Sequence, residues 1–228
     1  GSAEAAEMAK LAETTYRDVN IGLANQFARF AAANGIDIHK VIEASNSQPY
    51  SHLHQPGMSV GGHCIPVYPR LYLWNDPEAT VVRAARAANA GMPAYTVGLA
   101  ARAVGGDLSG KRVVVLGAAY RGGAKETAFS GVFAAVDELV ARGAVVLVHD
   151  PLYTDEELAR HGWAPYHFGE PVDVAIVHTD HTEYAALTAA DFPRLAVLVD
   201  GRARIDPARF PGVRVVTVGK PDQLATEG

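Results

Sequence analysis

Hydrophobic and polar positions follow different periods in the two halves of the chain. Up to about residue 104, apolar residues recur every three or four positions, which is helical spacing. From residue 112 onward, short continuous apolar runs alternate with helical patterns, as is typical of strands buried in a parallel sheet. The change predicts an α/β protein in two parts: an all-helical domain over residues 1–104 and a doubly wound parallel sheet over residues 105–228.

One long helix dominates the first part. Residues 4–34 contain no proline and are rich in alanine, glutamate and leucine, and Asn34-Gly35 supplies a stop. At 1.5 Å per residue, about 30 residues span roughly 45 Å, more than the width of a small domain. A helix of this length braces two domains or pairs with a copy of itself, and we expect a homodimer through it. Its apolar face consists of Met8, Leu11, Thr15, Val19, Leu23, Phe27 and Phe30.

Shorter elements complete the expected fold. Asp37 can cap a helix over residues 38–44, and Asp76-Pro77 is typical of a helix start. Ligands of doubly wound sheets bind at the carboxyl ends of the strands. Further helices are predicted over residues 76–89, 94–104 and 130–142, and strands over residues 112–117, 144–150, 172–178, 195–200 and 213–218.

The composition argues against several classes of protein. Of the 228 residues, 49% are hydrophobic and 20% charged, and the net charge is −5 without any basic block, so we expect no nucleic-acid partner. No apolar run approaches the ~20 residues of a membrane helix, so we expect no membrane partner. The single cysteine, Cys64, excludes an internal disulfide and fits a reducing compartment, which favours a cytoplasmic protein.

Cys64 is also the most conspicuous candidate for chemistry. It follows Gly61, Gly62 and His63, so a tight turn would present the thiol at a fixed angle. His63 could favour the thiolate, which is the reactive form. A lone cysteine is as readily a small buried apolar residue, and the residues alone leave both interpretations open.

Three histidines near the cysteine suggest a zinc site as an alternative. His52, His54 and His63 precede Cys64 within a short stretch, and both residue types bind zinc. Their spacing matches no common zinc pattern, and no carboxylate is close in sequence. We therefore expect no metal.

The glycine-rich turn over residues 117–123 is a candidate anion site. It lacks the complete G-x-G-x-x-G spacing of a dinucleotide fingerprint. Arg121 within the turn favours an anion, because a guanidinium can bind phosphate through two hydrogen bonds. A tight turn without any phosphate is the plain alternative, and the residues alone leave both open. Lys10, taken alone, is a solvated residue of the long helix.

Seven segments carry a resemblance to known proteins: residues 7–13, 16–21, 55–57, 60–66, 115–121, 149–151 and 200–202. Together they resemble the nucleotide-sugar dehydrogenase family, which comprises the UDP-glucose, UDP-N-acetylmannosamine and GDP-mannose 6-dehydrogenases. Members have an N-terminal NAD-binding Rossmann domain, a central helical dimerisation domain and a C-terminal Rossmann-like domain for the sugar nucleotide. The chain resembles the last two parts, so we expect a truncated enzyme, inactive alone.

The resemblance implies an activity and a set of site residues. The family oxidises the C6 alcohol of the sugar to a carboxylate with two NAD, and a UDP-sugar is favoured over a GDP-sugar. Cys64 would attack the C6 aldehyde, and Lys10 would stabilise oxyanions or relay protons. No cofactor-binding residue is expected in this chain. The implied substrate-binding residues are Gly61, Gly62, Tyr120, Arg121, Arg202, Tyr50 and His52.

Four positions depart from the family's pattern. Thr14 replaces an asparagine four residues after the lysine, and Tyr68 replaces an aspartate four residues after the cysteine. Tyr50 replaces an arginine often supplied across the dimer interface, and Ala128 replaces an arginine after the glycine-rich turn. These changes leave the sugar and the hydrolysis step open. A non-catalytic sugar-nucleotide-binding or regulatory module, or a purely structural dimerisation piece, remains the alternative.

Overall fold

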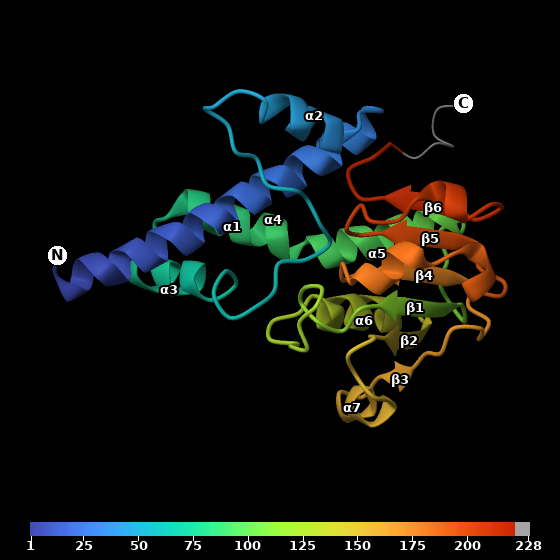
Figure 1. Cartoon of the computed structure of the whole chain (residues 1–228). Coiled ribbons are helices and arrows are strands. Elements are labelled where there is room, and N and C mark those ends of the chain that lie inside the picture. The colour runs from blue at the N-terminus through green and yellow to red at the C-terminus, as the bar shows by residue number, and fades with distance from the viewer. Residues whose placement is uncertain (222–228) are drawn as a thin grey trace.

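The computed structural model describes residues 1–221, which form a group of helices joined to a parallel sheet (Figure 1). The α/β class and the parallel sheet expected from the sequence are confirmed. The helices are α1 (Ala3–Ala33), α2 (Ile38–Ser45), α3 (Tyr68–Asn75), α4 (Thr80–Ala90), α5 (Met92–Ala103), α6 (Val132–Ala141) and α7 (Asp155–Arg160). The strands are β1 (Arg112–Leu116), β2 (Val145–His149), β3 (Ala164–Pro165), β4 (Val174–Val177), β5 (Val197–Asp200) and β6 (Arg214–Thr217).

The sheet has the strand order β3-β2-β1-β4-β5-β6, with every neighbouring pair parallel. This is the order of the Rossmann fold, and its switch point lies between β1 and β4. At that point Val113 pairs with Val146 on one side and with Val174 on the other. The carboxyl ends of β1 and β4 therefore meet at one edge, and they lead into Gly117 and His178.

The two faces of the sheet are covered differently. On one face, Val113 and Val115 of β1 share a core with residues of α5, α6 and α7. On the other face, Val114 and Leu116 pack with large aromatic residues from loops and short 3₁₀ helices. The aromatic residues of this second core are Tyr166, Tyr184, Phe192 and Phe210. Continuous apolar strands are the expected result, since both faces are buried.

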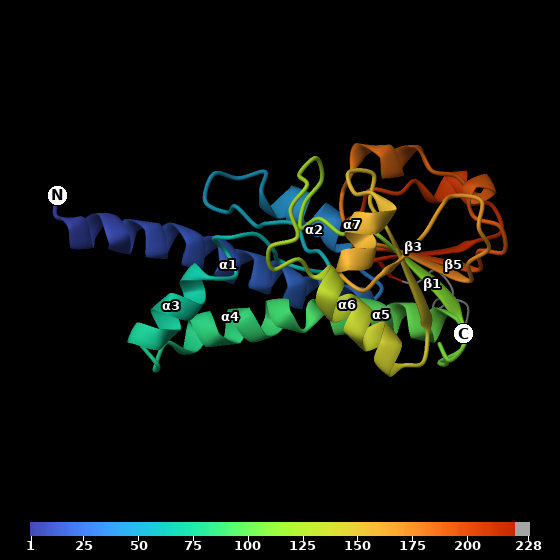
Figure 2. The ribbon, with the colours of Figure 1, turned by 90° about the horizontal axis from the view of Figure 1, so that it is seen from below.

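In the helical part, α1 and α4 lie side by side (Figure 2). A Cβ atom at Gly22 of α1 would lie 3.0 Å from Cα of Ala85 in α4, so glycine permits the close approach. One residue of the apolar face expected on the long helix, Thr15, is buried within this single chain. Four larger side chains of that face are exposed: Met8 (50%), Leu23 (40%), Phe27 (39%) and Phe30 (66%). The contact of α1 with a second copy stays a prediction.

The boundary expected at residues 104/105 also stays a prediction. Helix α5 precedes it, yet Val97 and Ala100 of α5 lie in the same core as the sheet. Met58, from the loop before α3, belongs to that core as well. The helical part and the sheet thus share apolar contacts. Within residues 1–221, no helix is long and apolar enough to cross a membrane.

The start of α4 was predicted wrongly. Asp76 is the C-terminal cap of α3, because its N–H donates to the carbonyl of Tyr72. Its carboxylate accepts from the N–H of Glu78 in a turn, and α4 begins only at Thr80. Helix α5 likewise begins at Met92 rather than at 94, since Pro93 fits the first turn. The sequence interpretation missed α3, α7 and β3.

Candidate active site

The loop that carries Cys64 is held against the carboxyl edge of the sheet at three places. The N–H of Met58 donates to the carbonyl of Gly201, with N and O 3.1 Å apart, and the N–H of Gly62 donates to that of Ala128 over 2.8 Å. Between them, Ser59 Oγ lies 2.9 Å from Nε2 of His178. The loop is therefore fixed relative to the strand ends rather than free in solvent.

Gly61 and Gly62 have a packing reason for being glycine. A Cβ atom at Gly61 would lie 2.6 Å from Cβ of Tyr120, and one at Gly62 would lie 2.9 Å from the Tyr120 ring. Gly62 also has φ of +94°, in the left-handed region that other residues adopt only with strain. Tyr120 thus packs directly on the turn that leads to Cys64.

Cys64 is half-buried, and its carbonyl accepts from the N–H groups of Val67 and Tyr68 at the start of α3. The ring of Tyr68 lies under Lys10 of α1, with Nζ 5.7 Å from the ring centroid. The pKa of Lys10 is raised, first by its hydrogen bond to Glu13 and also by the nearby Cys64 and Tyr68. Cys64 and Lys10, far apart in sequence, are thus within electrostatic reach of each other.

The side chain of His63 is hydrogen-bonded to Glu126, although its position in sequence suggested an interaction with the Cys64 thiol. Its Nε2 lies 3.1 Å from Oε2 of Glu126, and both side chains are exposed. The hydrogen bond from His63 is the main reason that the pKa of Glu126 is lowered. His63 therefore ties the cysteine loop to the turn after β1.

Arg202 joins the expected nucleotide residues at the strand ends. Its Nε donates to the carbonyl of His178 over 2.7 Å, and its Nη2 donates to that of Tyr120 over 3.4 Å. Arg121 is exposed, and its Nε donates to Tyr120 Oη over 3.1 Å. Burial lowers the pKa of Arg202, although Asp180 opposes the shift. A pocket of about 390 Å³ opens beside Arg202.

His178, which the sequence marked only as a strand end, connects the cysteine loop to this edge. It is fully buried, and burial lowers its pKa to about 3, with Arg202 adding to the shift. The ring is therefore neutral. Its Nδ1–H donates to the carbonyl of Gly117 over 2.8 Å, which leaves Nε2 to accept from the Ser59 hydroxyl.

The turn after β1 does not fit a dinucleotide. Its amides of Ala118 and Ala119 donate to Oδ2 of Asp150, over 2.8 and 2.9 Å. Burial opposes ionisation of Asp150, but hydrogen bonds from His181 and the amides prevail and lower its pKa. A buried carboxylate therefore takes the donors that a pyrophosphate would use in a Rossmann site.

Two expected substrate residues lie elsewhere, beside α1. Tyr50 is 93% exposed, and the carbonyl of His52 accepts from Nδ2 of Asn20 over 2.7 Å. Within residues 1–221, no hydrogen bond or ion pair joins either residue to Cys64 or Arg202. In the same part of the chain, no group of three or more histidine, cysteine or acidic side chains could hold a metal ion.

Two sequence models match most of the chain. The central domain of the UDP-glucose/GDP-mannose dehydrogenase family matches residues 4–91, and the UDP binding domain of the same family matches residues 114–207. The chain belongs to this dehydrogenase family. The resemblance seen in the sequence is thereby confirmed.

Individual relatives agree. UDP-N-acetyl-D-mannosamine dehydrogenase of Pyrococcus horikoshii is 35% identical over 210 residues, which are 88% of this chain and 49% of that protein. A solved structure of UDP-D-ManNAc dehydrogenase from the same organism superposes with a TM-score of 0.81 at 32% identity, over 94% of this chain and 52% of that one. A solved structure of a UDP-glucose dehydrogenase from Pyrobaculum islandicum superposes with a TM-score of 0.82 at 25% identity, over 93% of this chain and 50% of that one. The chain spans about half the length of these relatives.

All four departures from the family pattern have contacts in this chain, and at Tyr50 the backbone N–H donates to Oε1 of Gln48 over 2.7 Å. Thr14 Oγ1 donates to the carbonyl of Lys10 over 2.7 Å, on the same helix. Tyr68 places its ring beneath Lys10, and Ala128 contacts the cysteine loop through its backbone carbonyl. The contact of Ala128 is made by its backbone and does not depend on the side chain at position 128, so the loop can be held without an arginine there.

The chain also has a buried polar network that the sequence interpretation missed. Asp18 is completely buried and binds Arg86 through both carboxylate oxygens, each 2.6 Å from a guanidinium nitrogen. Asn89 donates to Asp18 over 2.7 Å and accepts from Asn25, whose own oxygen accepts from the N–H of Gly57. The network therefore links α1 and α4 to the start of the cysteine loop. The sequence feature that could have indicated this network is the pair of polar residues Asp18 and Asn25, seven residues apart on α1.

Proposed function

We propose that this chain provides the nucleophile and the nucleotide-binding edge of a nucleotide-sugar 6-dehydrogenase acting on a UDP-sugar. The observation that carries the proposal is the link from Ser59 to His178, whose carbonyl accepts from Arg202. A nucleotide bound at Arg202 would hold its sugar close to the loop of Cys64. The names of the relatives, dehydrogenases of UDP-sugars, support this substrate class.

The nucleotide would bind at the carboxyl edge of the sheet. Arg121 is exposed and Arg202 is hydrogen-bonded to the carbonyls of His178 and Tyr120, so one guanidinium would contact the diphosphate while the other shapes the site. Tyr120 would support both arginines and the turn at Gly61 and Gly62. Without a side chain at these glycines, the sugar could approach the backbone before Cys64.

Cys64 would act on the C6 aldehyde of the sugar. The thiolate forms a bond to the carbonyl carbon, and the π electrons move to oxygen, giving a thiohemiacetal oxyanion. The Lys10 ammonium would stabilise this oxyanion and donate its proton. After oxidation to a thioester, water would add to the acyl carbon, and the sulfur would leave as thiolate while the carboxylate forms.

We propose NAD as the hydride acceptor of the whole enzyme. The turn after β1 does not fit it, because Asp150 takes the amides of Ala118 and Ala119. The acceptor would therefore be held by groups other than this turn, and the chain alone should oxidise nothing.

A second copy of the chain would complete the assembly. The exposed apolar side chains of α1, among them Phe27 and Phe30, would lie in the interface of a homodimer. Tyr50, exposed at the tip of a loop beside α1, would reach the partner's substrate together with His52. Light scattering should report twice the chain mass; a monomer at micromolar concentration would contradict this part.

A non-catalytic nucleotide-sugar-binding module is the second candidate. It is favoured by Tyr68, which stands where many family members carry an aspartate and lies beneath Lys10. The two candidates differ at Cys64: a nucleophile should react with iodoacetamide in the folded protein. A thiol that reacts only after unfolding would leave the binding module as the better interpretation.

Calorimetry with UDP-glucose and UDP-N-acetylmannosamine tests the binding edge. Arg121→Ala should weaken binding roughly ten- to hundredfold, since a hydrogen bond to a charged group contributes about 1.5–3 kcal/mol. Arg160→Ala, the same charge change on α7, is the matched control and should leave affinity unchanged. Equal affinities for wild type and Arg121→Ala would refute the assignment of the edge.

A further inference from the structure

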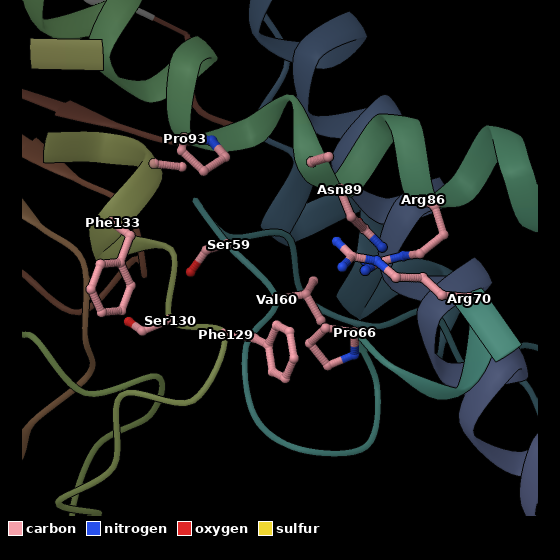
Figure 3. A pocket seen from close by; sticks show the side chains of 12 residues that line it. Ser59, Val60, Pro66, Arg70, Arg86, Asn89, Pro93, Phe129, Ser130 and Phe133 are labelled. Carbon is pink, nitrogen blue, oxygen red and sulfur yellow. The ribbon is translucent and has the colours of Figure 1, made fainter. Parts of the chain in front are cut away.

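A second pocket, separate from the nucleotide edge, lies behind the cysteine loop (Figure 3). Its volume is about 350 Å³, and it lies between the loop, helices α3 and α4, and the start of α6. Val60 and Pro66, on either side of the turn that carries Cys64, form part of its wall. Arg121 and Arg202 do not line it. We call it the Arg70 pocket.

One end of the Arg70 pocket carries an unbalanced positive charge. The heads of Arg70 and Arg86 lie at the same end in Figure 3. Arg86 is neutralised by Asp18, and both oxygens of Asp18 are already used by Arg86 and Asn89. Arg70 is close enough to lower the pKa of Asp18, although burial dominates and the net shift is upward.

Arg70 itself has no such partner. Among residues 1–221, its side chain forms no hydrogen bond and no ion pair within 4 Å. None of the described residues that line the pocket is acidic. The charges of Arg70, Arg86 and Asp18 therefore leave one uncompensated cation, the exposed Arg70, at the rim of the pocket, where its guanidinium can pair with an anion.

The remainder of the pocket is largely apolar. Phe129 and Phe133 lie along it away from the arginines (Figure 3), and both are partly exposed to solvent. Phe129 also has φ of +50°, a conformation that costs a non-glycine residue roughly 1–2 kcal/mol. The strained backbone presents an apolar ring on the surface, where a ligand with an apolar body could cover it.

We propose that the Arg70 pocket binds a small molecule with one anionic group, a carboxylate or a phosphate, on an aromatic or aliphatic body. The anion pairs with Arg70, and the body lies along Val60, Phe129 and Phe133. Among the described residues, the Arg70 pocket shares no lining residue with the pocket beside Arg202, so we expect the two to bind their ligands separately.

Calorimetry of the 228-residue chain with three probes tests this proposal. Phenyl phosphate carries both features, inorganic phosphate only the charge, and benzyl alcohol only the ring. Phenyl phosphate should bind more tightly than either of the others, and equally well with and without saturating UDP. Arg70→Gln should weaken it roughly tenfold or more, because an ion-paired hydrogen bond is lost.

Arg83→Gln is the matched control, because Arg83 lies on α4 outside the pocket and the change in net charge is the same. It should leave the affinity for phenyl phosphate unchanged. Equal weakening by the two variants would overturn the proposal, since the effect would then come from net charge. Displacement of phenyl phosphate by UDP would also overturn it, because the probe would then occupy the edge at Arg121 and Arg202.

Discussion

The two ends of the cysteine loop are built in different ways. The lead-in, residues 57–62, is bonded to α1, to the carboxyl ends of the strands and to the turn after β1. The exit, residues 63–67, is tied to that turn only by exposed side chains, those of His63 and Glu126, and it carries Cys64 beside Lys10, whose side chain is 43% exposed. The contrast indicates that precise placement is concentrated where the loop meets the carboxyl edge of the sheet, while Cys64 itself is only half-buried.

The largest effect is expected for the network behind the lead-in. Asp18→Ala would leave the largely buried Arg86 without its carboxylate, so the free energy of unfolding should fall by about 3–5 kcal/mol. Urea denaturation measures the loss. Glu13→Ala removes an exposed partner from Lys10 on the same helix and should change little. Similar small losses in both variants would mean that the buried network does not hold α1 on α4.

Gly62→Ala tests the lead-in at the turn itself. The alanine would have to keep φ of +94°, and its Cβ would lie 2.9 Å from the Tyr120 ring. We therefore expect the free energy of unfolding to fall by about 1–3 kcal/mol. Gly123→Ala has φ of +68° with nothing within 4 Å, and therefore reports strain without the contact. Gly62→Ala should be the more destabilising; equal losses would show that Tyr120 does not press on the turn.

Acid should weaken the sheet edge that anchors the lead-in. Burial lowers the pKa of His178 to about 3 and that of His149 to about 4, against 6.5 in the unfolded chain. Between about pH 6.5 and 4.5 the unfolded chain binds protons that the folded chain does not, so stability falls with decreasing pH. Each histidine contributes on the order of 1.4 kcal/mol per pH unit. Denaturation midpoints that stay constant over this pH range would contradict the view that His178 and His149 are buried and neutral. His149→Gln should make the fall of stability with decreasing pH shallower.

The sequence predicted the parts of the fold that depend on local pattern. Apolar runs located five of the six strands, and the proline-free segment located α1. Helix α3 was missed because residues 68–75 begin with Tyr-Pro and show no clear period, and β3 because two residues leave no pattern. Asp76 was misinterpreted because an aspartate before proline can end one helix as well as begin the next.

The candidate site was predictable only where resemblance supplied the residues. Spacing in sequence suggested that His63 serves Cys64, but the folded chain pairs it with Glu126 instead. Ser59 and His178 are separated by 119 positions, and only the strand order brings them together. Long-range hydrogen bonds of this kind leave no local periodicity, so a single sequence cannot show them.

The smallest expected effect concerns the exit of the loop. Lys10→Gln should leave the urea midpoint unchanged, because the ammonium is exposed. It should nevertheless slow the alkylation of Cys64 by iodoacetamide near pH 7, since the positive charge of Lys10 stabilises a negative charge on the sulfur. We expect roughly a two- to fivefold change, smaller in high salt, because charges in water interact weakly.

Lys125→Gln is the control for this measurement, because Lys125 is an exposed lysine paired with Glu157 and the change in net charge is the same. Its alkylation rate should match that of the wild type. A rate that falls equally in both variants would assign the effect to net charge, and a rate unchanged in Lys10→Gln would separate Lys10 from Cys64. A selective fall at constant stability would mean that Lys10 acts on the thiol rather than on the fold, as the openness of the exit implies.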